Sequence, residues 1–271
     1  MDTNQLLKGY GHYMRRKGCM DGTILTYMRI LHRLERDTGV PLIEVDRDAM
    51  EALLEALGLN PATYRMYVSV WHNFFKWAVM EEIIERDPTA RIVLPRLRQR
   101  LPRPILTDDL AKALVNADSK MKAVLLCAAY QGMRCIEIAG LRREDVLFDD
   151  GLLRVVKGKG MKERLLPLHP QLAEAFQRYR LPASGPVFMR VRGTPYPPNQ
   201  MSQYVAEYLH GIGVDATAHQ LRHWFATKLY AVSHDIRLTQ EMMGHADIKV
   251  TAIYTAFDRS AAKVSVDQIS V

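Results

Sequence analysis

The 271-residue sequence has little cysteine and no long apolar run, and each absence excludes a class of protein. Its three cysteines, Cys19, Cys127 and Cys135, form no CxxC pair, which argues against a disulfide framework and against a cysteine-type zinc site. No apolar run approaches the length of a membrane span, and residues 1–18 contain no signal-peptide core. These features fit a protein of the reducing cytoplasm.

Motifs for common cofactors are also missing. The segment Gly158-Lys159-Gly160 is not a dinucleotide fingerprint, because Glu163 occupies the position of the third glycine, and it is not a P-loop, because no GKS or GKT follows. His219 and His223 have the i,i+4 spacing of a zinc-binding helix. However, Gln220 replaces the glutamate of an HExxH motif and no obvious third ligand follows. We therefore expect no metal and no other cofactor.

What the sequence does contain is positive charge and ample apolar content. The formal net charge is +7, the pI is about 9.3, and 48% of the residues are hydrophobic. The length suggests two domains, and the apolar fraction is sufficient for a packed core. The charge favours a polyanionic partner, although a mildly basic protein without such a partner has the same balance.

Residues 2–93 have only helical patterns. We predict helices that begin at Asp2 or Thr3, at Thr23, just before Met50, and at Asn60-Pro61. The last of these is the clearest start signal, because an N-cap asparagine precedes a proline in the first turn. We expect residues 1–93 to form a compact module of four helices.

Residues 94–104 interrupt this helical pattern. Prolines at positions 95 and 102 oppose a helix and favour an extended connector. The stretch from 91 to 103 contains no acidic residue, and its arginines suit a path along a phosphate backbone, with a solvated linker as the alternative. These candidates for DNA contact are Arg91, Arg96, Arg98, Arg100 and Arg103.

Residues 105–271 have the pattern of a larger, mixed domain. We predict a helix that begins at Thr107-Asp108-Asp109, a second helix with Ser119 as its N-cap, and a β-hairpin over 152–156 and 163–168 with Lys159 at its tip. The other predicted elements are a surface helix over 170–179, a short strand over 186–189, a helix over 199–210, and a tail (about 258–271) that either frays or docks on a neighbouring subunit. The predicted fold class is therefore mainly α with a small antiparallel β-sheet (α+β).

Polar residues suited to phosphoryl chemistry occur at helical spacing in this domain. Arg134 and Glu137 are i,i+3 at a predicted helix start, where a partly buried guanidinium needs an anion. His219 and Arg222 are also i,i+3, so one helix can present both on one face. The remaining candidates are Lys159, His245 and Tyr254.

Together these residue types are what in-line attack on a phosphodiester requires without a metal. Guanidiniums bind the non-bridging oxygens bidentately and keep their charge. Electrostatic stabilisation of this kind is worth roughly 3–4 kcal/mol per well-placed donor. A tyrosine hydroxyl can act as the nucleophile, and a lysine on a hairpin can protonate the leaving sugar hydroxyl.

Four motifs resemble those of the tyrosine recombinase, or phage integrase, family. GMRCIEIAGL resembles its first-arginine box, VVKGKGMKERLLPL its lysine hairpin, AHQLRHWFAT its HxxR box and MGHADIKVTAIYTAF its histidine-to-tyrosine box. The resemblance covers roughly Leu106–Phe257, with His245 nine residues before Tyr254. It implies a site-specific DNA recombinase in which a helical core-binding domain and a catalytic domain close as a C-shaped clamp around duplex DNA.

The resemblance also implies a role for each candidate residue. Tyr254 would attack a DNA phosphate and form a 3′-phosphotyrosyl link, and Lys159 would protonate the 5′-hydroxyl leaving group. His219 would accept or donate a proton near the tyrosine. Arg134, Arg222 and His245 would hold the non-bridging oxygens, and Glu137 would support the site from behind.

The biological role stays open between members of this family. An integrase of a phage or mobile element, acting in the bacterial cytoplasm or nucleoid, is the first hypothesis, and a chromosome-dimer-resolving recombinase is the second. A DNA-binding regulator with a vestigial site is the third, and the complete set of catalytic candidates argues against it. A type IB topoisomerase shares the chemistry but acts as a monomer. Strand exchange implies a homo-tetramer on attachment or core sites, with a directionality factor or a host DNA-bending protein as further partners.

Overall fold

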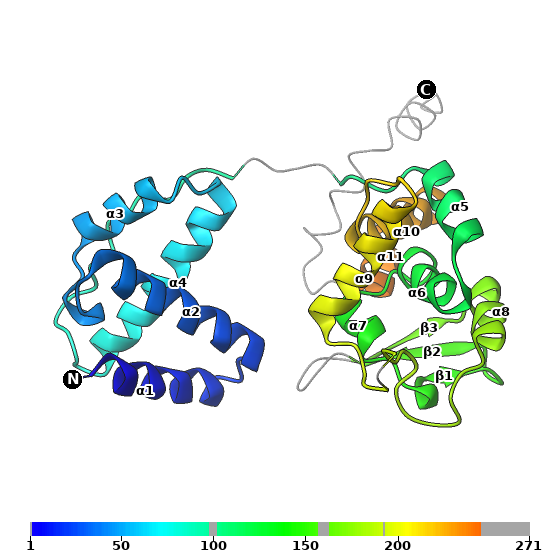
Figure 1. Cartoon of the computed structure of the whole chain (residues 1–271), viewed down its shortest axis with the longest axis horizontal. Coiled ribbons are helices and arrows are strands. Elements are labelled where there is room, and N and C mark those ends of the chain that lie inside the picture. The colour runs from blue at the N-terminus through cyan, green and yellow to red at the C-terminus, as the bar shows by residue number, and fades with distance from the viewer. Residues whose placement is uncertain (1, 98–101, 157–162, 192, 245–271) are drawn as a thin grey trace, which may run out of the picture. The chain divides into compact units, whose positions relative to one another are not determined.

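The computed structural model describes residues 2–97, 102–156, 163–191 and 193–244. The chain divides into two compact units, Met1–Gln99 and Arg100–Val271 (Figure 1). The division falls inside the stretch 94–104 that the sequence marks as a connector. Each unit has its own hydrophobic core.

The first unit is helical throughout its regular structure. Its α-helices are α1 (Thr3–Arg16), α2 (Asp21–Thr38), α3 (Arg47–Ala56) and α4 (Pro61–Met80), with a short 3₁₀ turn at Leu42–Glu44. These helices agree with the four that the sequence predicts.

One predicted helix start in this unit is confirmed and another is wrong. Helix α4 begins as predicted, because the Asn60 side chain accepts hydrogen bonds from the Ala62 and Thr63 amides. Helix α2 begins at Asp21, so the predicted start at Thr23 was wrong by two residues. The Met20 carbonyl already accepts from the Thr23 amide at 2.9 Å, which extends the helix toward its N-terminus.

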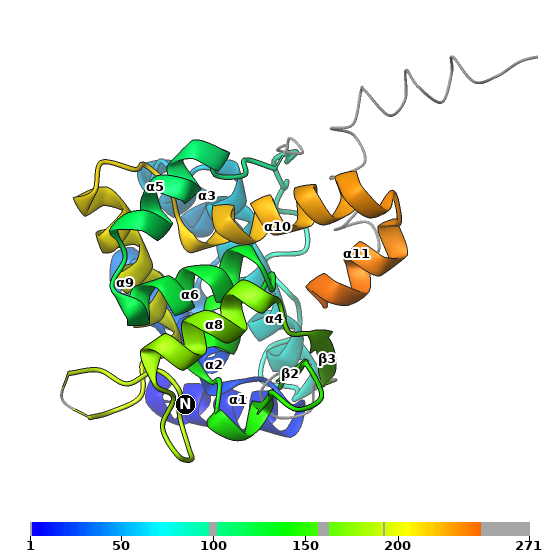
Figure 2. The same ribbon diagram turned by 90° about the vertical axis from the view of Figure 1, so that its right-hand side faces the viewer.

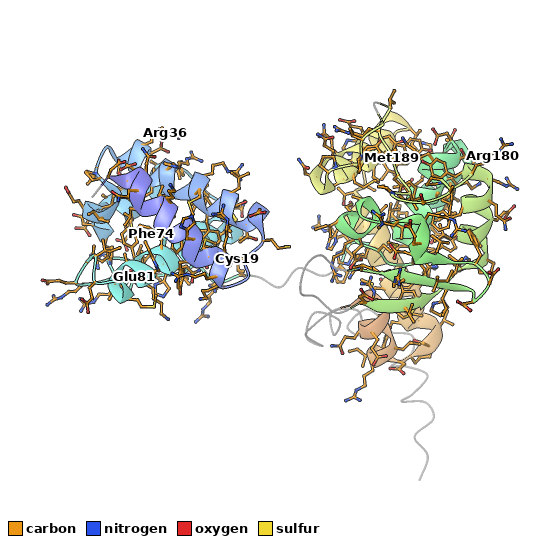
Figure 3. All side chains as sticks on the ribbon, turned by 90° about the horizontal axis from the view of Figure 1, so that it is seen from below. Cys19, Arg36, Phe74, Glu81, Arg180 and Met189 are labelled. Atoms are coloured by element: carbon orange, nitrogen blue, oxygen red, sulfur yellow. The ribbon has the colours of Figure 1, made fainter. Side chains whose placement is uncertain are left out.

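Aromatic side chains fill the core of the first unit. Trp71, Phe74 and Phe75 are fully buried, and the Tyr10 ring meets the Phe74 ring edge-on with 5.2 Å between centroids. Figure 3 shows Phe74 inside the unit and Arg36 at its outer edge. These residues lie on the buried faces of α1 and α4, where apolar side chains recur at helical spacing.

The second unit combines helices with a small sheet. Its α-helices are α5 (Thr107–Asn116), α6 (Ser119–Ala129), α7 (Cys135–Ala139), α8 (Pro170–Tyr179), α9 (Pro198–Gly211), α10 (Ala218–Ser233) and α11 (Ile236–Met243). Its strands are β1 (Val146–Leu147), β2 (Leu152–Val155) and β3 (Arg164–Pro167). They form an antiparallel sheet in the order β1-β2-β3, with Leu153 opposite both Val146 and Leu166. The predicted class, mainly α with a small antiparallel sheet, is confirmed.

Helix α6 is the centre of this unit. It is buried from Met121 to Ala129 apart from Lys122, and it packs between α10 and α8 (Figure 2). Cys127 is fully buried, and burial raises the pKa of its thiol, so it serves as a core residue. Helix α10 therefore packs against the buried core of this unit.

Two predictions for this unit need correction, and one strand was not predicted. The N-cap of α6 is Asp118, whose carboxylate accepts from the Met121 amide at 2.6 Å, and not Ser119. The predicted strand over 186–189 is absent, and isolated bridges from Pro186 to Arg142 and from Met189 to Pro195 occupy its place. The short strand β1 was not predicted. Within the described ranges, no helix is both long and apolar enough to cross a membrane.

Candidate active site

A buried carboxylate lies at the start of the short helix α7. Glu137 is the third residue of this helix, and its side chain is 1% exposed. Its Oε2 accepts a hydrogen bond from the Arg134 amide at 2.8 Å, which caps the helix N-terminus. A buried carboxylate is stable only when paired, so the groups around it determine what this part of the molecule does.

Three arginines from three elements surround this carboxylate. Arg164, the first residue of β3, donates from Nη1 to Oε1 at 2.8 Å and from Nη2 to Oε2 at 3.0 Å. Arg134 donates from Nη1 to Oε1 at 3.2 Å, and Arg222 of α10 places Nη1 3.9 Å from Oε2. We call Glu137 with these three residues the arginine cluster.

The cluster sets the protonation state of Glu137. Burial alone raises the pKa of this carboxyl. The hydrogen bonds and charge of Arg164 oppose burial, as do the Arg134 amide and the charge of Arg222, so the pKa falls to about 2. Glu137 is therefore ionised at neutral pH, and three arginines with one carboxylate leave the cluster with a net positive charge.

The same arginines bind the carboxyl end of α11. Arg164 Nε donates to the Met242 carbonyl at 3.1 Å, and Arg222 Nη2 donates to the Met243 carbonyl at 2.6 Å. Arg134 donates to the Met243 and Gly244 carbonyls, each at 3.3 Å. These carbonyls have no partner inside the helix and lie at the negative end of its dipole. Figure 1 shows α10 and α11 side by side at this part of the unit.

Two glycines are required where the backbone approaches the cluster. The Gly132 carbonyl accepts a hydrogen bond from Arg222 Nη1, and a Cβ at Gly132 would lie 2.4 Å from the Phe225 ring. A Cβ at Gly244 would lie 2.8 Å from Arg164 Nη1. Both glycines have positive φ, 62° and 59°, which other residues rarely adopt.

The arginines differ in their access to solvent. The Arg134 side chain is 34% exposed, that of Arg164 is 12% exposed, and that of Arg222 is 2% exposed. Arg134 therefore has the most accessible side chain of the three for an incoming anion. Arg222 is almost fully buried and adds positive charge in a region from which water is excluded.

Two histidines of α10 lie one turn apart beside the cluster. The ring centroids of His219 and His223 are 4.3 Å apart. Burial lowers the pKa of His219, and the charges of Arg222 and Arg134 lower it further. Burial, His219 and Arg222 together lower the pKa of His223 to about 4. Both rings are thus neutral at neutral pH, and a neutral imidazole can accept a proton.

The structure brings together four of the seven site residues named from the sequence. Arg134, Glu137, His219 and Arg222 lie at or beside the cluster. The other three candidates, Lys159, His245 and Tyr254, lie outside the described residues. The described chain ends at Gly244, directly before His245, and it resumes after the Lys159 segment at Glu163.

Of the predicted DNA-contacting arginines, those that the structure describes are exposed. Arg91, Arg96 and Arg103 are exposed, and none forms an ion pair with a described residue. Arg98 and Arg100 lie outside the described ranges. In the part of the chain that the structure covers, no three histidine, cysteine or acidic side chains gather closely enough to hold a metal.

Sequence reasoning missed Arg164 as a site residue. The quoted lysine-hairpin motif contains it, but no role was assigned to it. A signal was present, because alternation along β3 places Arg164 on the same face as the buried Leu166. An inward-facing arginine on a strand needs a buried anion, and Glu137 is the one it finds.

Comparison with known proteins agrees with this geometry. Residues 104–260 match the model of the phage integrase family. Tyrosine recombinase XerC of Neisseria meningitidis serogroup C (strain 053442) is 32% identical over 269 residues, which cover 90% of this chain and 88% of that protein.

Solved structures show the same fold. A lambda integrase (75-356) dimer bound to a COC′ core site superposes with a TM-score of 0.74 at 19% identity, covering 92% of this chain and 97% of that one. A lambda integrase tetramer bound to a Holliday junction gives a TM-score of 0.72 at 18% identity, covering 90% and 77%. From the family model and the identity to XerC together, the chain belongs to the phage integrase family and is a tyrosine-type site-specific DNA recombinase.

Proposed function

We propose that this recombinase is an integrase, which cleaves and rejoins duplex DNA through a 3′-phosphotyrosyl intermediate to integrate and excise a phage genome or other mobile element. The observation that carries the proposal is the arginine cluster. It holds a net positive charge in a fixed geometry, with one arginine side chain partly exposed. Such an arrangement fits the extra negative charge of a pentacoordinate phosphate in the transition state.

In this proposal the phosphate binds at the arginine cluster and next to the segment that follows Gly244. Arg134, the most accessible member, holds a non-bridging oxygen directly. Arg222 contributes its charge from below, where the low dielectric strengthens it. In this proposal His245, which directly follows Gly244, donates to the same phosphate oxygens. Glu137 fixes the positions of the guanidiniums that donate hydrogen bonds to it.

The reaction conserves the phosphodiester energy. The phenolic oxygen of Tyr254 forms a bond to phosphorus as the bond from phosphorus to the 5′-oxygen breaks. His219, whose neutral ring can take a proton, assists removal of the phenolic proton, and Lys159 gives a proton to the departing 5′-hydroxyl. The reverse step, with a 5′-hydroxyl of another strand as nucleophile, releases the tyrosine and reseals the DNA. No external energy source is needed.

The partners follow from this chemistry. Residues 1–93 would bind the core site as a helical DNA-binding domain, and the 91–103 arginines would follow the backbone between the two domains. The lambda integrase tetramer on a Holliday junction supports a homo-tetramer of this chain on two duplexes. The tail 258–271 would then dock on a neighbouring subunit, and a directionality factor or host DNA-bending protein would set the direction of the reaction.

A chromosome-dimer-resolving recombinase is the second candidate, and the 32% identity to XerC favours it. The two roles differ in their DNA targets, because an integrase acts on attachment sites and a dimer resolvase acts on a chromosomal site. Mapping covalent complexes on the DNA that flanks the gene and on the host chromosome separates them. Adducts confined to a chromosomal resolution site would reject the integrase role.

Substitution of the nucleophile tests the chemistry. Tyr254→Phe removes the phenolic oxygen that attacks phosphorus, so we expect retained DNA binding and no covalent adduct on a nicked suicide substrate. The measurement is adduct yield on a denaturing gel. Tyr230→Phe is the matched control, because it makes the same change on α10, and it should leave the yield unchanged.

Two results would contradict the proposal. Undiminished adduct formation by Tyr254→Phe would reject that residue as the nucleophile. Cleavage that is lost in EDTA and restored by magnesium would favour a metal-dependent nuclease over tyrosine chemistry.

A further inference from the structure

Each of the three nitrogens of one guanidinium in the cluster donates a hydrogen bond to the protein itself. Arg164 Nη1 and Nη2 bind the two oxygens of Glu137 at 2.8 and 3.0 Å, and Nε binds the Met242 carbonyl at 3.1 Å. The side chain is 12% exposed. An arginine committed in this way is poorly placed to bind a DNA phosphate, so its function must lie in what it does to its neighbours.

We propose that Arg164 is a positioning residue for strand cleavage: by binding both oxygens of Glu137, it limits the pairing of Arg134 with this carboxylate and so keeps Arg134 placed for the scissile phosphate. This inference rests on the proposed function, because it assumes that the phosphate binds at the cluster. It assigns Arg164 no direct contact with DNA.

The competition for Glu137 supports this role. Arg134 lies 3.2 Å from Oε1 and Arg222 lies 3.9 Å from Oε2, so both are within reach of the carboxylate if Arg164 is removed. A buried carboxylate that loses its bidentate partner pairs with the nearest remaining cation, since an uncompensated buried charge is strongly destabilising. A guanidinium drawn into that pairing has fewer N–H groups available for a phosphate, and the carboxylate neutralises its charge.

Arg164 also contacts the backbone close to two other catalytic candidates. It lies five residues after Lys159, and the α11 carbonyl it binds lies three residues before His245. Gly244 packs against its guanidinium so closely that a Cβ there would be 2.8 Å from Nη1. One side chain therefore fixes the backbone at the edges of both segments that carry the remaining catalytic candidates.

An ammonium group can replace this guanidinium only in part. Glu137 presents two oxygens, and the Met242 carbonyl lies on a third side, which matches the planar fork of arginine. A lysine would keep the positive charge near Glu137 but would satisfy only part of this set. Arg164→Lys is thus expected to retain part of the function and Arg164→Gln to retain little.

A double-substitution cycle tests the proposal. Single-turnover cleavage of a nicked suicide substrate is measured at saturating protein for the wild type, Arg164→Gln, Arg164→Lys, Glu137→Gln and the double variant Arg164→Gln/Glu137→Gln. Thermal melting and DNA affinity are measured for each. We expect Arg164→Gln to slow cleavage about tenfold to a hundredfold, less than the loss of a direct donor to the transition state, with little change in DNA affinity.

The double variant separates positioning from simple structural support. Once Glu137 is neutral it no longer competes for Arg134, so the double variant should cleave faster than Arg164→Gln alone. A folded Arg164→Gln protein that cleaves at the wild-type rate would overturn the proposal. So would a double variant no faster than the single one, because a purely structural loss adds to the second change and is not relieved by it.

Two safeguards keep the result interpretable. If Arg164→Gln does not fold, the same comparison is made between Arg164→Lys and Arg164→Lys/Glu137→Gln, with the same criterion. A wild-type protein that forms no adduct rejects the proposed function itself, before any variant is compared. Failure of the further inference is therefore distinct from failure of the recombinase chemistry.

Discussion

Arginine is used in two different ways in this protein. In the cluster, Arg164 and Arg222 are 12% and 2% exposed, and fixed partners hold them in place. In the 91–103 stretch, Arg91, Arg96 and Arg103 are exposed and form no ion pair with any described residue. The same side chain thus serves as fixed machinery in one region and as solvated surface charge in the other.

This difference in burial determines how closely the surroundings of each arginine are specified. A buried guanidinium is expensive to leave unpaired, so its neighbours are specified closely, including the two glycines whose Cβ positions are blocked. An exposed guanidinium is hydrated and screened, so its exact position matters little and salt controls its effect. We expect substitutions at the cluster to change stability and rate, and substitutions in the stretch to change affinity alone.

The largest effect should come from filling the space beside the cluster. Gly132→Ala places a Cβ 2.4 Å from the Phe225 ring at φ +62° and displaces the carbonyl that Arg222 binds. We expect a loss of about 2 to 5 kcal/mol in the free energy of unfolding, the sum of left-handed strain and overpacking. Denaturant unfolding measures it, and single-turnover cleavage should slow as well.

A second glycine separates strain from packing. Gly151 has φ +63°, almost the same as Gly132, but a Cβ there meets nothing within 4 Å. Gly151→Ala should therefore lose only about 1–2 kcal/mol, the cost of the backbone conformation. Equal losses for the two variants would show that Phe225 does not pack closely against Gly132.

The next effect should appear in DNA binding. Replacing Arg91, Arg96 and Arg103 together by alanine should leave the free energy of unfolding within about 0.5 kcal/mol of wild type, because all three are exposed. DNA affinity should fall for every sequence. The slope of log K against log salt should decrease by about 0.9 for each DNA phosphate that the variant no longer neutralises. Binding titrations over a range of salt concentrations give this slope.

A control with the same charge change makes this result specific. Arg36, Arg47 and Arg178 are exposed arginines that pair with acidic neighbours. Their triple alanine variant also removes three positive charges, but we expect it to change the salt slope little. An equal decrease in both variants would attribute the effect to net charge and return the 91–103 stretch to a solvated linker.

The sequence predicted elements better than it predicted the cluster. Helix α8 has both predicted bounds, 170–179, because Pro170 sets its start and the local pattern specifies the rest. The short strand β1 has only two residues, and Pro186 forms its bridge with Arg142, which is 44 residues earlier in the chain, so local patterns gave poor evidence for these features.

The same distinction applies to the site residues. The pairing of Arg134 with Glu137 spans three residues and follows from helix geometry. The contacts of Arg164 join residues 27 and 78 positions apart, and one of them ends on a main-chain carbonyl, which has no side-chain signature. The roles of Lys159, His245 and Tyr254 stay predictions from the family motifs.

The smallest effect should be the acid sensitivity of the cluster. The folded pKa of His223, about 4, lies below the ordinary value of 6.5, so the unfolded chain binds more protons between these pH values. Stability should therefore fall as pH drops from 6.5 to 4. Glu137, with a folded pKa of about 2 against 4.5, should continue the loss from pH 4.5 to 2 as its carboxylate is protonated. The 91–103 arginines keep their charge throughout, so they contribute nothing to either loss.

Removing the imidazole isolates the upper part of this profile. His223→Asn should flatten the dependence of unfolding free energy on pH between 6.5 and 4 by about 1 to 2 kcal/mol, a reduced value because the ring is only partly buried. The loss between pH 4.5 and 2 should remain, because Glu137 still pairs with the arginines. Denaturant unfolding at half-unit pH steps measures both segments. An unchanged slope above pH 4 would mean that the folded and unfolded states protonate His223 equally, and the acid sensitivity would then belong to the carboxylate alone.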